Sequence, residues 1–325
     1  MIDEVRPRLT RIPLYPGPLP QLCPDCPPWP GDIHRCDGVA LHVRHTPGPE
    51  RGEVAVYLHG LGGSASNFTD LAGLVSTRLA GMAIDLPGFG RSTPPEGFDY
   101  ALDSHAEVIT VFLAGLGVGP VHLVGNSMGG AVALLVAARH PQLVRTLTLL
   151  APAMPDLRIG LGRVSDLRMA LTFLPVVGSW ARRALAGMPA EEQVERTLRQ
   201  CFADPSAVGS MRRAAAVQEC VERASLPWAL AALHLSAQQL VRSWLVPRSR
   251  SLWRVAGQVR APALVVWGAS DKLVSVRKAP RTAAVLPRGR LLVLPRTGHL
   301  PQMERPTSVA RAMLGMIDAV QDAAW

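Results

Sequence analysis

The sequence lacks the features that would place the protein in a membrane, in the secretory pathway or on nucleic acid. No apolar run approaches the roughly 18 residues of a membrane-spanning helix. The opening stretch, MIDEVRPRLTRIPLYPGPLP, contains acids, arginines and prolines but no apolar secretory core, so we expect a cytoplasmic protein. No RNA-binding motif and no run of interleaved basic and aromatic residues is present, so we expect no nucleic-acid partner.

Lysine is scarce, with only Lys272 and Lys278 among 325 residues, and arginine supplies the remaining positive charge. The formal net charge is +9, while 48% of the residues are hydrophobic and 18% charged, a composition typical of a globular protein. Residues 154–260 contain fifteen arginines, no lysine and eight acidic residues, which gives +7 for this segment. We expect this charge to favour acidic substrates and peripheral contact with anionic lipid.

Cysteine is also scarce, and three of the five cysteines lie in the stretch CPDCPPWPGDIHRC. Cys23, Cys26, Cys36 and His34 offer four ligands, but the His-x-Cys pair is too short to complete a tetrahedral zinc site comfortably. We therefore predict no structural zinc here and expect reduced thiols in a proline-stiffened arm. No cofactor or other metal is expected.

Strand and helix patterns alternate along most of the chain. Residues 1–30 are proline-rich and aperiodic, and a β-hairpin is expected around the turn pair Asp37-Gly38. Short apolar runs such as VAVYLHG then alternate with helical periodicity up to Pro152, which is typical of parallel strands with crossover helices. The pattern resumes at APALVVWGASDKLV and GRLLVLPRTGH. The sequence thus predicts an α/β fold.

A helical insertion interrupts this alternation at residues 154–260. We divide the chain into an arm at 1–30, a core formed by 31–153 and 261–325, and this insertion as a helical cap. Helices are expected in MPAEEQVERTLRQCF and PWALAALHLSAQQLVRSWL, and Cys201 and Cys220 are expected on helix faces. The apolar inner face of the second helix is predicted to consist of Trp228, Leu230, Leu233, Leu240 and Trp244.

The stretch LVGNSMGGAVALL places Ser127 in a G-x-S-x-G motif between a strand and a helix. In such a turn the flanking glycines avoid a collision between strand and helix, and the serine hydroxyl points out at the carboxyl edge of the sheet. Met128 opens the helix, so its backbone N–H is a free donor beside that hydroxyl. The sequence therefore predicts a nucleophile at Ser127.

A nucleophilic serine needs a base, an orienting acid and donors for the oxyanion. Asp271 and His299 each follow a predicted strand, in the order serine, acid, histidine. We predict Asp271 as the acid, with Asp156 as its rival, and His299 as the base. The loop LHGLGGS is expected to supply the N–H of Leu61 as the second oxyanion donor. The histidine of that loop, His59, is expected to fix the loop and to have no catalytic role.

The stretches HGLGGS, DLPGFGRS, GNSMGG, WGASDKLV and GHLPQMERP together resemble the α/β-hydrolase fold superfamily. The resemblance implies a mostly parallel eight-stranded sheet with a helical cap inserted after the sixth strand. It also implies Ser127 as nucleophile, Asp271 as acid, His299 as base, and oxyanion donors at Leu61 and Met128. A serine at the nucleophile turn is unlike the aspartate of haloalkane dehalogenases and epoxide hydrolases.

Within that superfamily, the expected function is hydrolysis of a carboxylic ester with an apolar acyl group. Asn126 stands where lipases and esterases usually have histidine, and GNSMGG also resembles hydrolases that cleave carbon–carbon bonds in ring-fission diketones. Those enzymes usually have a serine-glycine-proline stretch where this chain has LGGS, and a shorter cap. Two alternatives therefore stay open, the carbon–carbon hydrolase and a non-catalytic member that binds a small apolar ligand.

Overall fold

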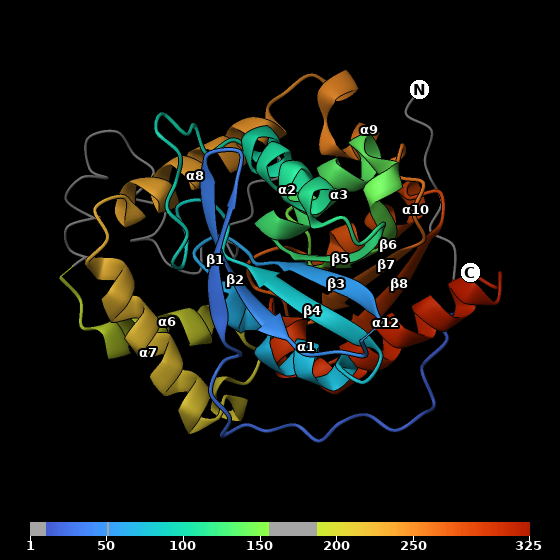
Figure 1. Cartoon of the computed structure of the whole chain (residues 1–325), viewed down its shortest axis with the longest axis horizontal. Helices are drawn as coiled ribbons and strands as arrows, with labels where there is room; N and C mark the ends of the chain where they lie inside the picture. The colour runs from blue at the N-terminus through green and yellow to red at the C-terminus, as the bar shows by residue number, and fades with distance from the viewer. Residues whose placement is uncertain (1–10, 51, 156–186) are drawn as a thin grey trace.

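A single eight-stranded sheet forms the centre of the protein, which a computed structural model describes for residues 11–50, 52–155 and 187–325 (Figure 1). The strand order is β1-β2-β4-β3-β5-β6-β7-β8. β1 and β2 are antiparallel to their neighbours, and the other six strands run parallel. The strands are β1 Gly31–Cys36, β2 Val39–Thr46, β3 Glu53–Leu58, β4 Leu79–Ile84, β5 Val121–Asn126, β6 Val144–Leu150, β7 Ala263–Gly268 and β8 Gly289–Leu294. The predicted α/β fold with a mostly parallel eight-stranded sheet is confirmed.

Helices cover both faces of this sheet and create two hydrophobic cores. One face packs against α1 and α12, and the other packs against α2, α3, α9 and α10 (Figure 1). The core helices are α1 Thr69–Val75, α2 Leu102–Leu116, α3 Met128–Arg139, α9 Leu252–Ala256, α10 Ala279–Val285, α11 Pro301–Glu304 and α12 Pro306–Gln321. Within the described ranges, no helix is both long and apolar enough to cross a bilayer.

The expected hairpin around Asp37-Gly38 is present as β1 and β2. Both turn residues have positive φ, 45° for Asp37 and 76° for Gly38, as a type I′ turn requires. β1 is the edge strand, and β2 joins it to the parallel part of the sheet through β4.

The insertion follows β6, and its described part is helical as predicted. It contains α6 Ala190–Cys201, α7 Ser210–Ala224 and α8 Ala229–Trp244, which lie beside one end of the sheet (Figure 1). The last helix of the insertion, α9, packs against α3 through Leu252 and Ala256 and so belongs physically to the core. The domain boundaries stay predictions, and Asp156 lies outside the described residues.

The described part of the arm, residues 11–30, has no helix or strand and runs past α12 and α1 toward β1 (Figure 1). Trp29 Nε1 donates to Thr69 O over 2.9 Å. Cys23 and Cys26 form a disulfide, so the expectation of reduced thiols is wrong for these two residues. The C-x-x-C turn brings their Cα atoms to 5.3 Å, within the range that a disulfide spans. Since disulfides are typical of oxidising compartments, the cytoplasmic location stays a prediction.

Candidate active site

Ser127 lies at the turn between β5 and α3 with a strained backbone. Its φ is 52° and its ψ is −116°, a conformation that costs a non-glycine residue about 1–3 kcal/mol. A Cβ on Gly125 would lie 2.3 Å from Gly129 O, and a Cβ on Gly129 would lie 2.3 Å from Leu58 O. Both flanking positions therefore require glycine, as the G-x-S-x-G interpretation predicts.

His299 and Asp271 lie together at the ends of the loops that follow β8 and β7. With the carboxylate as acceptor, His299 Nδ1 donates to Asp271 Oδ2 over 2.8 Å, and both side chains are buried. Asp271 Oδ1 accepts the N–H groups of Leu273 at 2.8 Å and Val274 at 2.9 Å. The carboxylate is thus held in place, and it fixes the tautomer of His299 with Nε2 free to accept a proton.

The His299 loop is tied to the serine turn and to the insertion. Asn126 Nδ2, next to Ser127, donates to His299 O over 3.2 Å. His299 N donates to Cys201 O, at the end of α6, over 2.6 Å. Asn126 therefore has a structural role at the position where lipases usually have histidine, because it links the turn to the histidine loop.

The loop after β3 passes Ser127 at close range. A Cβ on Gly60 would lie 3.0 Å from Ser127 Cβ, so the backbone approaches the serine directly. Gly60 O accepts hydrogen bonds from His59 Nδ1 at 2.7 Å and from Gly63 N at 3.0 Å. Because the N–H of a trans peptide points opposite to its C=O, these two bonds also fix the direction of the Leu61 N–H.

Neither predicted oxyanion donor has an acceptor within the part of the chain that the structure describes. The N–H groups of Leu61 and Met128 both lack a hydrogen-bond partner there, although Met128 is fully buried. Free donors at a helix start and a tight loop can bind an anionic oxygen. The arrangement can therefore stabilise negative charge beside Ser127.

His59 connects the Leu61 loop to the loop after β4. Its Nδ1–H donates to Gly60 O, and its Nε2 accepts from Leu86 N over 3.0 Å. Burial lowers the pKa of His59 and so favours the neutral ring, which has one donor and one acceptor. This geometry agrees with the expected loop-fixing role.

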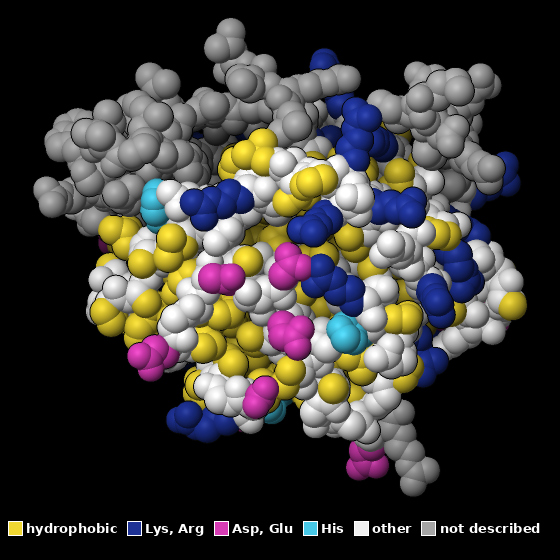
Figure 2. Space-filling view, turned by 90° about the horizontal axis from the view of Figure 1, so that it is seen from above, with side chains coloured by type: hydrophobic (Ala, Val, Ile, Leu, Met, Phe, Trp, Pro, Cys, Tyr) yellow, Lys and Arg dark blue, Asp and Glu magenta, His cyan; other side chains and the backbone are white. Residues whose placement is uncertain are grey.

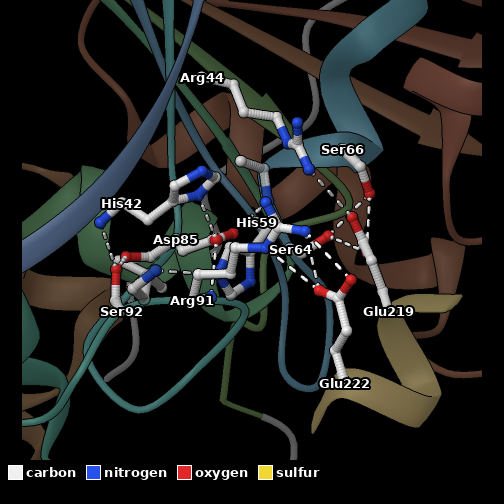
Figure 3. Close-up of polar contacts among 12 residues, drawn as sticks. His42, Arg44, His59, Ser64, Ser66, Asp85, Arg91, Ser92, Glu219 and Glu222 are labelled. Atoms are coloured by element: carbon white, nitrogen blue, oxygen red, sulfur yellow. Dashed lines mark hydrogen bonds and ion pairs between the residues drawn. The ribbon is translucent and has the colours of Figure 1, made fainter. Parts of the chain in front are cut away.

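Asp85 forms a second buried polar centre that the sequence analysis did not assign (Figure 3). Its carboxylate accepts from His42 Nδ1 at 2.8 Å, Ala65 N at 2.6 Å and Arg91 N at 3.0 Å. Burial opposes ionisation, but these hydrogen bonds and nearby His59 outweigh it and hold the pKa of Asp85 below its usual value. The sequence signal that could have indicated Asp85 is its position directly after a strand, in the stretch DLPGFG.

Helix α7 of the insertion is bound to these loops by polar contacts (Figure 3). Glu219 accepts from Ser64 Oγ at 2.7 Å and Ser66 Oγ at 3.0 Å, and Glu222 pairs with Arg91 at 2.9 Å. In addition, Arg223 Nη1 donates to Gly62 O over 2.8 Å. The insertion therefore contacts the loop that presents the Leu61 N–H.

Helix α8 packs against the loops around Ser127, and its inner face includes three of the five predicted residues. Trp244 Nε1 donates to Ala153 O over 3.3 Å, and Ala153 N donates to Ser127 O over 2.9 Å. The inner face is the i+4 row of Trp228, Ala232, Ser236, Leu240 and Trp244.

Leu230 and Leu233 do not belong to that inner face, because they are 48% and 41% exposed. Ala232 stands close to Gly88, with 2.8 Å between its Cβ and the position of a Cβ on Gly88, so position 232 of the inner face needs a small side chain. In contrast, Cys220 of α7 is buried, as expected for a helix-face residue, and it packs with the buried Val194 and Leu198 of α6. Cys201, at the end of α6, is half-buried.

The sheet, the strained serine turn after β5 and the helices inserted after β6 define a hydrolase of the α/β class. A model of the alpha/beta hydrolase fold matches residues 55–306, and the chain belongs to this family. The chain is 32% identical to a dihydrolipoyllysine-residue acetyltransferase component of an acetoin cleaving system from Pseudomonas putida, over 83% of this chain and 65% of that relative.

Two further similarities point to hydrolases with different named activities. The chain is 28% identical to a 2-hydroxy-6-oxononadienedioate/2-hydroxy-6-oxononatrienedioate hydrolase from Comamonas testosteroni, over 82% of this chain and 88% of the relative. A solved structure of a membrane phospholipase A, described as a bacterial virulence factor, superposes with a TM-score of 0.70 at 27% identity, covering 90% of this chain and 87% of that one. The chain is thus an α/β hydrolase with hydrolase relatives.

Proposed function

We propose that the protein is a serine hydrolase that cleaves a carboxylic ester with an apolar acyl group. The observation that carries the proposal is the buried Asp271–His299 pair, whose loop is tied to the strained turn of Ser127. A carboxylate that orients a neutral imidazole beside a serine is the arrangement of acyl-transfer catalysis.

In the proposed mechanism, His299 Nε2 takes the proton of Ser127 Oγ as that oxygen attacks the ester carbonyl carbon. The N–H groups of Leu61 and Met128 hold the oxyanion, each contributing about 3 kcal/mol to the stability of the transition state. Collapse of the tetrahedral intermediate breaks the ester C–O bond, and His299 returns the proton to the leaving alcohol. A water molecule, activated by His299, then releases the acid from Ser127.

The substrate class is proposed from the insertion that lies over this edge of the sheet. Exposed Leu233 reaches the loop of Leu61, since its Cδ1 lies 3.4 Å from where a Cβ on Gly62 would stand. An apolar acyl group can pack there. Figure 2 shows one face of the molecule, on which Lys and Arg side chains are spread between hydrophobic ones with some Asp and Glu among them. The net charge of +7 over residues 154–260 supports the proposed attraction of acidic substrates and anionic lipid.

Carbon–carbon bond hydrolysis of ring-fission diketones is a second candidate, and the Comamonas testosteroni relative favours it. The phospholipase neighbour supports the ester proposal. The two reactions use the same serine, histidine and oxyanion donors, so the substrate itself must decide between them. A non-catalytic ligand-binding member would leave Ser127 unreactive.

The test is a comparison of kcat/KM for p-nitrophenyl esters from acetate to palmitate with kcat/KM for ring-fission diketones, at low and high salt. We expect short to medium esters to be turned over best, and anionic esters to react more slowly at high salt because the positive insertion is screened. Ser127→Ala should lose both turnover and labelling by a fluorophosphonate.

Three results would contradict parts of the proposal. Diketone cleavage far faster than any ester would establish the carbon–carbon hydrolase. Salt-independent rates on anionic esters would remove the role of the basic insertion. An unlabelled wild-type protein without turnover would favour the ligand-binding alternative.

A further inference from the structure

Two histidines and an aspartate converge on the hairpin β1–β2, in a cluster outside the candidate active site. Asp32 and His34 lie two residues apart on β1, so their side chains share one face of the strand. His45 lies on β2, where its N–H donates to Pro30 O over 2.8 Å. It is opposite Met82, in the second half of the parallel strand β4. β1 is the edge strand, and β2, β4 and β3 separate it from β5, the strand that leads to Ser127.

The three polar atoms form a nearly equilateral triangle. His34 Nε2 lies 3.1 Å from His45 Nε2, and each of these atoms lies 3.0 Å from Asp32 Oδ1. Within the described residues, this is the group of His, Cys, Asp and Glu side chains whose ligand atoms come close enough together to hold one metal ion.

No protonation state of the two histidines makes all three contacts of this triangle hydrogen bonds. If both Nε2 atoms carry a proton, both can donate to Asp32, but two N–H donors then face each other. If one Nε2 is unprotonated, its lone pair can face the other imidazole but also faces the carboxylate oxygen. In every tautomer at least one contact joins two like groups, whereas a cation would attract all three atoms at once.

The dimensions of the triangle fit a small divalent ion. Bonds of about 2.1 Å to nitrogen and oxygen place neighbouring ligand atoms about 3.0 Å apart in an octahedral site and about 3.4 Å apart in a tetrahedral one. The observed 3.0–3.1 Å matches an octahedral face. Ca²⁺ fits poorly, because it prefers oxygen ligands at about 2.3–2.6 Å.

We propose that Asp32, His34 and His45 bind one divalent first-row transition-metal ion, such as Zn²⁺ or Co²⁺, at the outer edge of the sheet. Asp32 is 70% exposed and both histidine side chains are 33% exposed, so water can reach the remaining coordination positions. The ion would cross-link β1 to β2 and thereby hold the edge hairpin together. This site differs from the zinc site that was rejected in the sequence analysis. That site would have joined His34 to Cys23, Cys26 and Cys36, but Cys23 and Cys26 form a disulfide.

The test is titration of the chelator-treated full chain with Co²⁺ and Zn²⁺, measured by visible absorption and calorimetry. We expect one ion per chain and a higher Tm with Zn²⁺, because an ion that binds only the folded state stabilises it. His34→Gln and His45→Gln should each weaken binding at least about tenfold, since even outer-shell partners of a metal contribute that much. Asp32→Asn should weaken it too, and because Asp32 is exposed this variant should keep the fold.

Two control variants separate this site from other ligands. His140→Gln removes a histidine elsewhere, and Cys36→Ser removes the free thiol at the end of the same strand. Both should bind like wild type. The proposal is wrong if wild type takes up no ion, if the double variant His34→Gln/His45→Gln binds as well as wild type, or if only Cys36→Ser abolishes binding. Ester turnover after chelation should be unchanged, so this test is independent of the proposed function.

Discussion

At the scale of single residues, Asp271 has the most specific surroundings of the predicted site. Its side chain is fully buried, with one oxygen on His299 and the other on two backbone N–H groups. Asparagine can occupy the same space, but its amide would present the wrong hydrogen-bonding group to His299 Nδ1 or to the backbone donors. We predict that Asp271→Asn lowers kcat by about 10⁴-fold with little change in fold, as loss of the orienting acid does in serine proteases.

Asp156→Asn is the matched control for this prediction, because Asp156 was the rival acid in the sequence analysis. Steady-state kinetics on the best ester and circular dichroism should show near wild-type behaviour for this variant. Full activity of Asp271→Asn together with inactivity of Asp156→Asn would move the acid to position 156.

Single residues also show which parts of the candidate site can be predicted from the sequence. Ser127 was predicted from the G-x-S-x-G motif, and Asp271 and His299 were predicted from the strands that they follow, because parallel strands end at one edge of the sheet. The catalytic roles of these three residues stay predictions. Asp85 was missed because its partners His42, Ala65 and Arg91 come from three separate segments. A local sequence pattern does not show which residues from distant segments contact one another.

At the scale of elements, α7 contributes to the geometry of the candidate active site. Arg223 holds Gly62 O, and Gly62 follows the residue whose N–H is the proposed oxyanion donor. We predict that Arg223→Ala lowers kcat about tenfold with a smaller change in KM, because a shifted donor affects the transition state more than the bound substrate. Arg223→Lys should recover part of the activity.

Arg212→Ala is the matched control on the same helix. Arg212 pairs with Asp70 at 2.6 Å, so it docks α7 onto α1 without touching the Gly62 loop. Its loss should lower stability and leave kcat near wild type, as measured by thermal melting and ester kinetics. Equal losses of kcat in both variants would indicate that α7 acts only through general docking.

Helix α8 shows that helical periodicity alone does not identify which face of a helix is buried. Its sequence contains apolar residues on more than one side, and helical spacing places Leu230 and Leu233 in one group with Trp228, Leu240 and Trp244. The folded protein instead has Ala232 and Ser236 on the buried row, and Ala232 lies so close to the loop at Gly88 that a leucine would not fit at this position. The choice of face depends on a neighbouring loop, which the helix sequence does not specify.

At the scale of the whole molecule, the buried His105 makes stability depend on pH. Neither ring nitrogen has a partner among the described residues, and the ring packs beside Phe98, with 5.0 Å between centroids. Burial, together with nearby His59, lowers the pKa of His105 to about 3. The folded state therefore binds fewer protons than the unfolded state, whose histidine has a pKa of about 6.5.

The sign follows from this difference in proton binding. The contribution of His105 to stability is fully present above about pH 6.5, and it is lost as pH falls from there toward about 3. We predict that His105 alone costs about 2 kcal/mol between pH 7 and pH 5. His105→Phe should remove that part of the slope in urea unfolding measured over this range. Parallel curves for wild type and His105→Phe would contradict the prediction, and His140→Gln serves as the control.

The arm has a consequence for how the chain acquires its structure during synthesis. Tyr15 N donates to Arg311 O over 2.9 Å, and Arg311 Nη1 donates to Tyr15 O over 2.6 Å, across 296 residues of sequence. Arg290 Nη1 likewise donates to Arg11 O. The part of the arm around Arg11 and Tyr15 leaves the ribosome long before these partners exist, so it cannot form these contacts until β8 and α12 have been synthesised. The segment translated early is therefore among the last to reach its final place.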